Sequence, residues 1–188
     1  GSTVSVETAP KTGTFNTRGV IPGFNGPFGP SFLAVSPDGT RAAAGTNGGG
    51  SIAVFNTSNP TVVTNYSMQD SSGEWVDNRY LAVANFSTTS GVQVLDTTTS
   101  AVKQVISNIA GSSAGVTVDA AGNLYAANGS GSSPGGSSVG WIKEFSAAAW
   151  QNAMATSTPL NFEPTGTPVA DLLSAYPIGF DTSERRLF

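Results

Sequence analysis

Short apolar runs recur along the chain, and residues that favour tight turns separate them. In the segments Ile52–Phe55 and Val92–Leu95 the apolar positions follow the two-residue period of strands rather than helical spacing. The intervening stretches supply Pro, Gly, Asn and Asp, which tolerate the backbone angles of turns. In the first part of the chain with this pattern we expect four strands, at residues 32–35, 41–45, 51–55 and 62–66.

An internal repeat organises these expected strands. The segment 52–57 (IAVFNT) lines up with 92–97 (VQVLDT) at an offset of forty residues. Two further alignments pair 41–47 with 79–85, and 81–85 with 124–128. A period near forty indicates an array of similar structural units, and four antiparallel strands per unit is the pattern of a β-propeller blade. The expected fold class is therefore all-β.

The repeat predicts a single domain, 1–188, made of successive blades. Its expected parts are an N-terminal strand and loop at 1–30, blades at 31–68, 71–108 and 113–175, and the start of a further blade at 176–188. Inside the third blade, Ser146 precedes a run of good helix formers that ends at Ala155, which predicts a short inserted helix capped by the serine. A further helical turn is expected at 171–174.

The last unit stops after two short apolar stretches. An open ring with an unfinished blade would leave unpaired backbone at its edges, which favours association or aggregation. We therefore expect further residues or a second chain to complete the ring. The alternative is that the chain is an ordered fragment of a longer protein.

Composition narrows the classes of function. Only 11% of residues are charged, the net charge is −4, and the eight Lys and Arg residues form no basic stripe, so nucleic acid is not an expected partner. The chain has no His and no Cys, so any catalysis would use carboxylates, Tyr, Lys, Arg or a hard cation. No apolar window is long enough to span a membrane. Abundant Ser and Thr with few charges favour an extracellular or cell-surface location.

The residues Ser36–Arg41, followed by Ser51–Thr57, resemble the YVTN-type β-propeller repeat, in which a PDG turn, an apolar strand, an Asn-rich loop and an IDT-like strand come in order. The third copy, Gly115–Asn128, is similar to the related NHL and gluconolactonase repeats. The resemblance implies a ring of six or seven four-stranded blades, of which this chain carries about half. Such repeats occur in cell-surface proteins, lactonases, muconate cyclases and binding modules, so the resemblance specifies fold more than activity.

Three asparagines are the first candidates for a binding site. Asn47, Asn85 and Asn128 are each expected to close the second strand of a blade, in corresponding positions on one face of the ring. Their amides could hydrogen-bond a sugar or contribute carbonyl oxygens to Ca²⁺. The alternative interpretation is that an asparagine before Gly or Ser is simply a turn residue.

The resemblance to gluconolactonases also implies where a cation would bind, at the start of the first strand of each blade. Those positions hold Ser31, Ser71, Ala114 and Tyr176, so the cation ligands of the family are missing there. No cofactor is therefore expected, and Ca²⁺ binding is kept as an alternative. Glu74, the nearest carboxylate, and Tyr176 are additional candidate ligand-binding residues. Trp75 is expected to pack between blades. Turn roles are expected for the aspartates at 70, 77, 119 and 181.

These observations favour a secreted or cell-surface β-propeller that binds a protein or glycan, or that builds a surface layer. The first alternative is a lactonase-like or muconate-cyclase-like enzyme whose catalytic residues lie largely outside this chain. Another is a structural subunit whose open edges add strands from partners.

Overall fold

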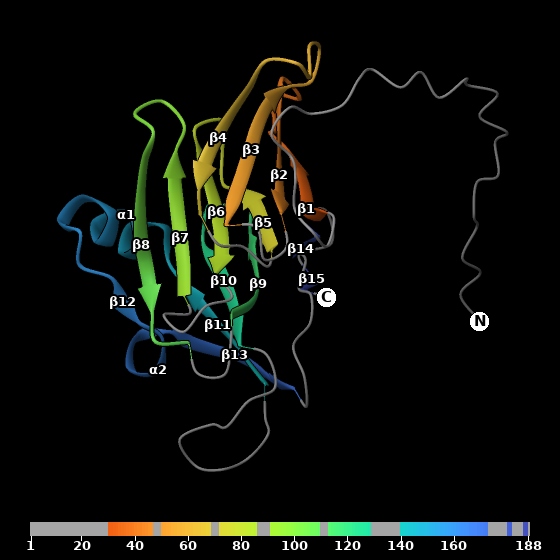
Figure 1. The fold of residues 1–188 in the computed structure, drawn as a ribbon. Coiled ribbons are helices and arrows are strands. Elements are labelled where there is room, and N and C mark those ends of the chain that lie inside the picture. The colour runs from red at the N-terminus through yellow and green to blue at the C-terminus, as the bar shows by residue number, and fades with distance from the viewer. Residues whose placement is uncertain are drawn as a thin grey trace, which may run out of the picture.

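The computed structural model describes residues 30–46, 50–68, 72–85, 91–109, 113–128, 140–172, 180–181 and 186–187. Within these ranges the chain forms three mainly antiparallel sheets and a short hairpin, which confirms the all-β prediction (Figure 1). Blade 1 is a sheet of four strands in chain order: β1 (Pro30–Val35), β2 (Arg41–Thr46), β3 (Ser51–Asn56) and β4 (Val63–Ser67). The four strands expected from the first repeat are thus confirmed.

Blade 2 has the same four-stranded arrangement and one added strand at its outer edge. Its strands are β5 (Ser72–Trp75), β6 (Tyr80–Asn85), β7 (Gly91–Asp96) and β8 (Ala101–Ser107). The two-residue strand β12 (Leu160–Asn161) arrives from much later in the chain and pairs in parallel with the end of β8. This pairing covers part of an edge that would otherwise present free backbone groups.

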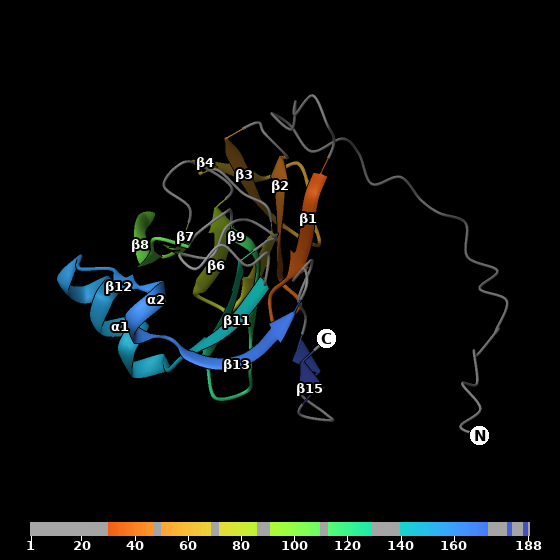
Figure 2. The same cartoon turned by 90° about the horizontal axis from the view of Figure 1, so that it is seen from below.

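Blade 3 follows in the same way, and the start of a further unit comes after it. Its strands are β9 (Ser113–Val118), β10 (Leu124–Asn128), β11 (Gly140–Phe145) and β13 (Thr167–Leu172). A hairpin of β14 (Phe180–Asp181) and β15 (Arg186–Leu187) comes last. Seen from below, the three blades follow one another around a common centre, and the hairpin lies below β1 near the end of β13 (Figure 2).

The predicted helix is confirmed as α1 (Ala147–Thr156). Ser146 is its N-cap and accepts a hydrogen bond from the backbone N–H of Ala149. After α1 the chain forms β12 and the short helix α2 (Phe162–Thr165). The helical turn predicted at 171–174 is wrong for Asp171 and Leu172, the two described residues, because both pair with β11 as part of β13. The free edge of β11 requires a strand partner, and this pairing overrides local helix propensity.

Both faces of blade 2 are buried, each against a neighbouring blade. Successive side chains of a strand point to opposite faces, and β6 divides accordingly. Leu81 and Val83 lie in the core between blades 1 and 2, whereas Ala82 and Ala84 lie in the core between blades 2 and 3. All four side chains are inaccessible to solvent. The blades therefore pack face to face around a common centre, as a propeller requires.

Close contacts fix the packing of blade 1 on blade 2. Trp75 is buried between them, as predicted, with the Arg41 guanidinium 5.0 Å from the ring centroid and the indole N–H donating to the Ala34 carbonyl at 3.2 Å. The ring of Phe32 occupies the space beside Gly73, where a Cβ atom would lie 2.5 Å from the Phe32 Cζ atom. Any larger residue at this position would force the Phe32 ring to move.

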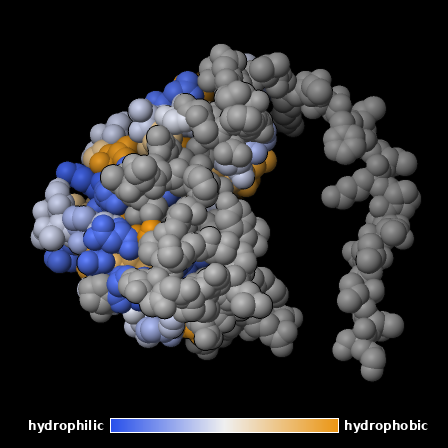
Figure 3. All heavy atoms as spheres, turned by 60° about the horizontal axis from the view of Figure 1, so that its bottom comes forward, coloured by the Kyte–Doolittle hydropathy of each residue, from blue (hydrophilic) through white to orange (hydrophobic). Residues whose placement is uncertain are grey.

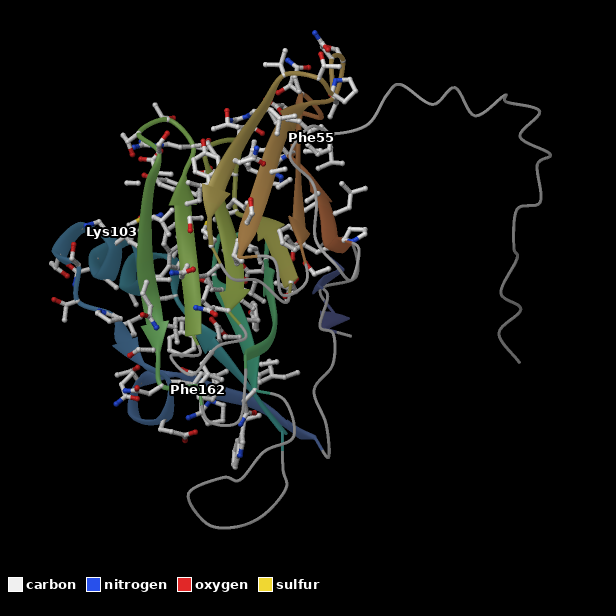
Figure 4. The ribbon with its side chains drawn as sticks, in the orientation of Figure 1. Phe55, Lys103 and Phe162 are labelled. Atoms are coloured by element: carbon white, nitrogen blue, oxygen red, sulfur yellow. The ribbon has the colours of Figure 1, made fainter. Side chains whose placement is uncertain are left out.

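The inserted segment fills the space between the outer parts of blades 2 and 3. Trp150 of α1 is completely buried, donates its indole N–H to the Gly122 carbonyl at 2.9 Å, and meets Tyr80 edge to face at 5.7 Å. Phe162 of α2 is also fully buried in the core between these blades, near the lower end of β8 in Figure 4. On the outer side, Lys103 of β8 donates to the Ser157 hydroxyl at 2.8 Å.

We expect Trp150→Ala to lower the free energy of unfolding by about 3–5 kcal/mol, because it empties a buried site and leaves the Gly122 carbonyl without its donor. Gln151→Ala is the matched control, since Gln151 is the exposed neighbour on the same helix. This control should change stability by less than about 0.5 kcal/mol. Urea unfolding of both variants measures the difference, and equal midpoints would contradict the assigned role of Trp150.

Candidate functional site

Asn85 and Asn128 are the last residues of β6 and β10, in corresponding positions of blades 2 and 3. The strand pairings establish the correspondence, because Leu81 pairs with Trp75 and Leu124 pairs with Val118, four residues before each asparagine. Both asparagines are therefore on the face of their blade that looks toward the preceding blade. The predicted alignment of 81–85 with 124–128 is confirmed.

The alignment of 41–47 with 79–85 is wrong by one residue. Gly45 pairs with Ile52, and Ala84 pairs with Val92, the repeat equivalent of Ile52. Thr46, not Asn47, therefore corresponds to Asn85. The alignment matched Arg41 with Arg79, but Thr40 is the residue equivalent to Arg79. The Thr40 carbonyl accepts from the Thr57 N–H just as the Arg79 carbonyl accepts from the Thr97 N–H. Asn47 itself lies outside the described residues.

The two described asparagines are buried and only partly hydrogen-bonded. Asn128 accepts a hydrogen bond at Oδ1 from the backbone N–H of Trp141, while its Nδ2 has no partner among the described residues. Asn85 has a buried Oδ1 atom that likewise lacks a described donor. A buried amide atom without a partner costs about 1–3 kcal/mol relative to a satisfied one. Turn geometry alone does not account for these side chains.

Gln93 is a third residue of this kind, and the sequence analysis did not identify it. Its Oε1 atom is buried with no partner among the described residues. Gln93 pairs with Val83, and Asn85 pairs with Gly91, so the two amides are diagonal neighbours on the face of blade 2 that looks toward blade 1. A polar residue at an inward position of β7, within a run of apolar residues, was the signal available in the sequence.

Glu74 links the inner strands of blades 2 and 3. Its Oε2 atom accepts hydrogen bonds from the Thr117 hydroxyl at 2.5 Å and from the backbone N–H of Val118 at 3.2 Å. Beside it, Ser72 accepts from the Val116 N–H at 3.0 Å, so two side chains of β5 satisfy the free edge of β9. Burial raises the pKa of Glu74, and the two hydrogen bonds partly oppose that increase. The Glu74 side chain therefore stabilises the contact between blades 2 and 3.

The opposite ends of the blades carry a polar turn network. Asp77 accepts from the N–H groups of Arg79 and Tyr80, and Asp119 accepts from those of Ala121 and Asn123, so both aspartates are turn residues as predicted. The turns also touch across blades, since Asn78 accepts from the Asp38 N–H at 2.9 Å. Of the other two aspartates expected in turns, Asp70 lies outside the described residues, and Asp181 is in β14.

Arg79 and Asp96 form a bidentate ion pair in this network. Arg79 donates from Nε at 2.9 Å and from a terminal nitrogen at 2.6 Å to the two carboxylate oxygens. The hydrogen bonds from Arg79 hold the pKa of Asp96 well below its usual range. Asp96 also accepts from the Thr98 N–H, which closes the turn between β7 and β8. The pair therefore fixes a turn rather than preparing a catalytic carboxylate.

Lys143 is a buried cation that the sequence analysis did not identify. It occupies in blade 3 the position that Gln93 holds in blade 2, and its Nζ atom donates to the carbonyls of Phe162 and Glu163 at 3.0 and 2.7 Å. The Glu163 carboxylate is a third partner at 3.4 Å. With three acceptors for three N–H bonds, Lys143 anchors α2 to blade 3.

The described residues contain no group of three Asp or Glu side chains placed to hold a metal ion. Of the positions that the gluconolactonase resemblance implies for cation ligands, Ser31 lies in β1 and Ala114 in β9, and neither side chain is a carboxylate. Ser71 and Tyr176 lie outside the described residues. Within the described part of the chain, no helix has the length and apolar character needed to cross a bilayer.

The fold and these contacts define a β-propeller, and comparison with solved structures agrees. The chain is similar to the Kuenenia stuttgartiensis hydrazine synthase (15% identity, TM-score 0.54, 77% of this chain and 37% of that one). It is also similar to a chain of the nidogen/laminin complex, with 10% identity and a TM-score of 0.61 over 81% of this chain and 52% of that one. A third similar structure is the β-propeller domain of Myceliophteria thermophila Cps50 (Swd1), with 11% identity and a TM-score of 0.57 over 85% of this chain and 48% of that one. At these identities the likeness concerns fold alone.

The chain spans about half or less of the solved chains it matches. No protein-family model matches the sequence, and a search of curated proteins finds no match. The resemblance to YVTN-type repeats therefore stays a prediction, whereas the propeller fold is supported by independent structures.

The raised pKa of Glu74 predicts a pH dependence of stability. A carboxyl group whose pKa is higher in the folded state binds its proton more tightly there, so stability falls as the pH rises from the ordinary value of 4.5 through the folded pKa. Glu74→Gln keeps an oxygen acceptor and does not ionise. The difference in unfolding free energy, variant minus wild type, should therefore increase over this pH window.

Urea unfolding at a series of pH values measures this difference. Thr117→Val provides a second check, because it removes a hydrogen bond that favours the ionised form of Glu74 and should extend the pH dependence to higher pH. A difference between wild type and Glu74→Gln that stays constant with pH would exclude titration of Glu74 in the folded protein.

Proposed function

We propose that this protein is a secreted or cell-surface β-propeller of the YVTN type that acts as a binding module. Its ligand would bind at the end of the blades where the second strands finish. The observation that carries this proposal is the set of buried amide atoms, on Asn85, Gln93 and Asn128, that lack partners among the described residues. Buried amide groups are normally hydrogen-bonded, and exceptions require an explanation.

The chemistry of these atoms favours an uncharged polar ligand. Asn85 and Gln93 offer carbonyl oxygens, which accept hydrogen bonds, whereas Asn128 offers an N–H group, which donates. Sugar hydroxyls and peptide groups supply both donors and acceptors, so a glycan or an extended protein segment fits the set. Ca²⁺ would use only the carbonyl oxygens and is therefore the weaker match.

The composition of the chain agrees with a ligand of this kind. Figure 3 brings the bottom of Figure 1 forward, and its coloured surface mixes hydrophilic residues with small hydrophobic areas. The low content of charged residues, 11%, supports binding through hydroxyl and amide groups rather than through ion pairs. The nidogen/laminin complex shows that a chain with a similar fold occurs in a protein complex, which is an analogy of fold.

The proposed binding site requires a complete ring of blades, because a ligand at the centre of a propeller is surrounded by blades on all sides. The structure describes three blades and a hairpin arranged around a common centre (Figure 2). We propose that the remaining blades come from further residues or from a second chain. The binding residues described above would then form one side of a closed mouth.

Saturation-transfer NMR with neutral oligosaccharides, and with a peptide library as a second arm, tests the binding role. Asn128→Asp should weaken binding at least tenfold, because it replaces the free N–H donor by an acceptor while keeping Oδ1 for Trp141. Asn152→Asp makes the same chemical change on the exposed side of α1 and should have no effect. A ligand that binds both variants and wild type equally would place the site elsewhere.

Stability measurements separate a binding role from a structural one. If Asn85 is retained for ligand binding, Asn85→Leu should leave stability unchanged or raise it by up to about 1–3 kcal/mol, because it removes an unsatisfied buried oxygen. The same variant should lose ligand affinity. Chemical unfolding and the NMR titration together make the test, and a strongly destabilised variant would instead assign Asn85 a structural role.

Adding millimolar calcium should not change the melting temperature of the protein. A clear increase in the melting temperature would favour Ca²⁺ as the ligand.

A further inference from the structure

The three tryptophans of the chain lie in different surroundings. Trp75 and Trp150 are buried, and each donates its indole N–H to a backbone carbonyl. Trp141, the second residue of β11, is only partly buried against the core between blades 2 and 3, and its indole N–H donates to no described residue. A partly exposed aromatic ring with a free donor at its edge is typical of binding surfaces, because the ring provides a large and rigid contact area.

The fold itself does not require a large side chain at this position. Ser51, Gly91 and Trp141 are equivalent in the three blades, because each directly precedes the third-strand residue that pairs with the penultimate residue of the second strand. In blade 2 a Cβ atom on Gly91 would lie 2.1 Å from the Ile106 carbonyl oxygen, so no side chain fits there. Blade 1 has a small serine. Among the three described blades, the tryptophan is therefore a feature of blade 3 and not of the repeat.

Trp141 lies beside Asn128, one of the residues assigned to the ligand above. Its backbone N–H donates to the Oδ1 atom of Asn128. Lys143, two residues after Trp141, pairs with Ala126, two residues before Asn128, so Trp141 and Asn128 share the face of blade 3 that looks toward blade 2. The Nδ2 atom of Asn128 has no partner among the described residues. An aromatic ring and two unpaired N–H donors thus occur together at this end of blade 3.

The chemistry of these groups favours a neutral sugar. The face of an indole ring carries negative partial charge, which attracts C–H groups and disfavours an anion. The two free groups are N–H donors, which repel the N–H groups of a cation and require oxygen acceptors on the ligand. A pyranose ring offers both features in a single unit, because its C–H groups form an apolar face and its hydroxyls lie around the rim.

We propose that Trp141 is a stacking residue for a neutral pyranose sugar, whose hydroxyls accept from the indole N–H and from Nδ2 of Asn128. The inference rests on the proposed binding function, narrows its ligand from a glycan or peptide to a glycan, and adds a residue that the buried amides did not reveal. Asn128 also positions Trp141, because its Oδ1 atom holds the backbone at the start of β11. Trp141 provides the exposed part of the contact.

Fluorine NMR of the protein labelled with 5-fluorotryptophan tests the proposal on the wild-type sequence. The three tryptophans each give a resonance, and Trp141→Phe identifies the one from Trp141. The probes are neutral gluco-, manno- and galacto-oligosaccharides. At least one of them should shift the Trp141 resonance and leave those of the buried Trp75 and Trp150 in place. Anionic oligogalacturonate and cationic chitosan oligomers should cause no shift at the same concentration.

Affinity measurements on variants give a second readout. Trp141→Ala should weaken binding of the shifting oligosaccharide by about tenfold, because a stacked aromatic contact contributes on the order of one factor of ten in affinity. Trp141→Phe should weaken it less, since phenylalanine keeps a ring face and lacks the N–H. Tyr66→Ala is the matched control, because Tyr66 is also a partly buried aromatic packed against a core, but in β4 of blade 1. This control should leave the affinity unchanged.

The possible results separate the role of Trp141 from the proposed function. Sugar binding that is weakened by Asn128→Asp but not by Trp141→Ala would overturn the stacking role and leave the binding module intact. A Trp141 resonance that only the peptide library shifts would have the same meaning. If neither oligosaccharides nor peptides shift the Trp141 resonance or bind in a way that depends on Asn128, both proposals are wrong. The wild-type NMR measurement decides the case even if the alanine variant does not fold.

Discussion

The structure depends on one constraint, which is that each four-stranded sheet is apolar on both faces and must be covered on both. Strand β6 is the clearest example, because its residues 81–84 point alternately into the core between blades 1 and 2 and the core between blades 2 and 3, and none of the four is accessible to solvent. At roughly 25 cal/mol for each Å² of apolar surface removed from water, this burial between blades is the main stabilising contribution available to a chain in which only 11% of residues are charged. A blade alone would be unstable, and an array of blades is the result.

The inserted segment extends the same constraint to the periphery. Neighbouring blades diverge as they run outward from the centre, so the sheets alone would leave a gap between blades 2 and 3. Trp150 and Phe162 fill that gap, and β12 covers part of the outer edge of blade 2. Lys143 is buried there with three acceptors, so its charge is compensated rather than available for chemistry. The insertion is therefore a packing element with the same role as a further layer.

Polar residues at the two ends of the blades differ in how completely they are hydrogen-bonded. At one end, aspartates, asparagines and arginines satisfy one another and the turn backbone, and the Arg79–Asp96 pair is an example. At the other end, buried amide atoms of Asn85, Gln93 and Asn128 have no partner among the described residues. A completed network stabilises the fold, whereas an incomplete one leaves hydrogen-bonding groups for the ligand that we propose. The second end is accordingly the better candidate for a ligand.

Much of the fold could be predicted because it rests on local patterns. Two-residue periodicity located the strands of blade 1, the forty-residue repeat gave the number of complete blades, and Ser146 with the following alanines gave the helix. The site was predicted only in part. Asn85 and Asn128 were found because their neighbourhoods repeat, while Gln93 and Lys143 were missed because their meaning depends on which face of a strand they occupy.

The sequence by itself therefore determined the repeated four-stranded unit, since alternation and turn residues act within a few positions of the chain. Only the tertiary structure decided the register between copies, in which Thr46 and not Asn47 corresponds to Asn85. The tertiary structure alone also decided that residues 167–172 form a strand paired with β11. It likewise decided that Glu74 links β5 to β9. These features depend on hydrogen-bonding groups that meet across long separations in the chain, and no local pattern records which of them will meet.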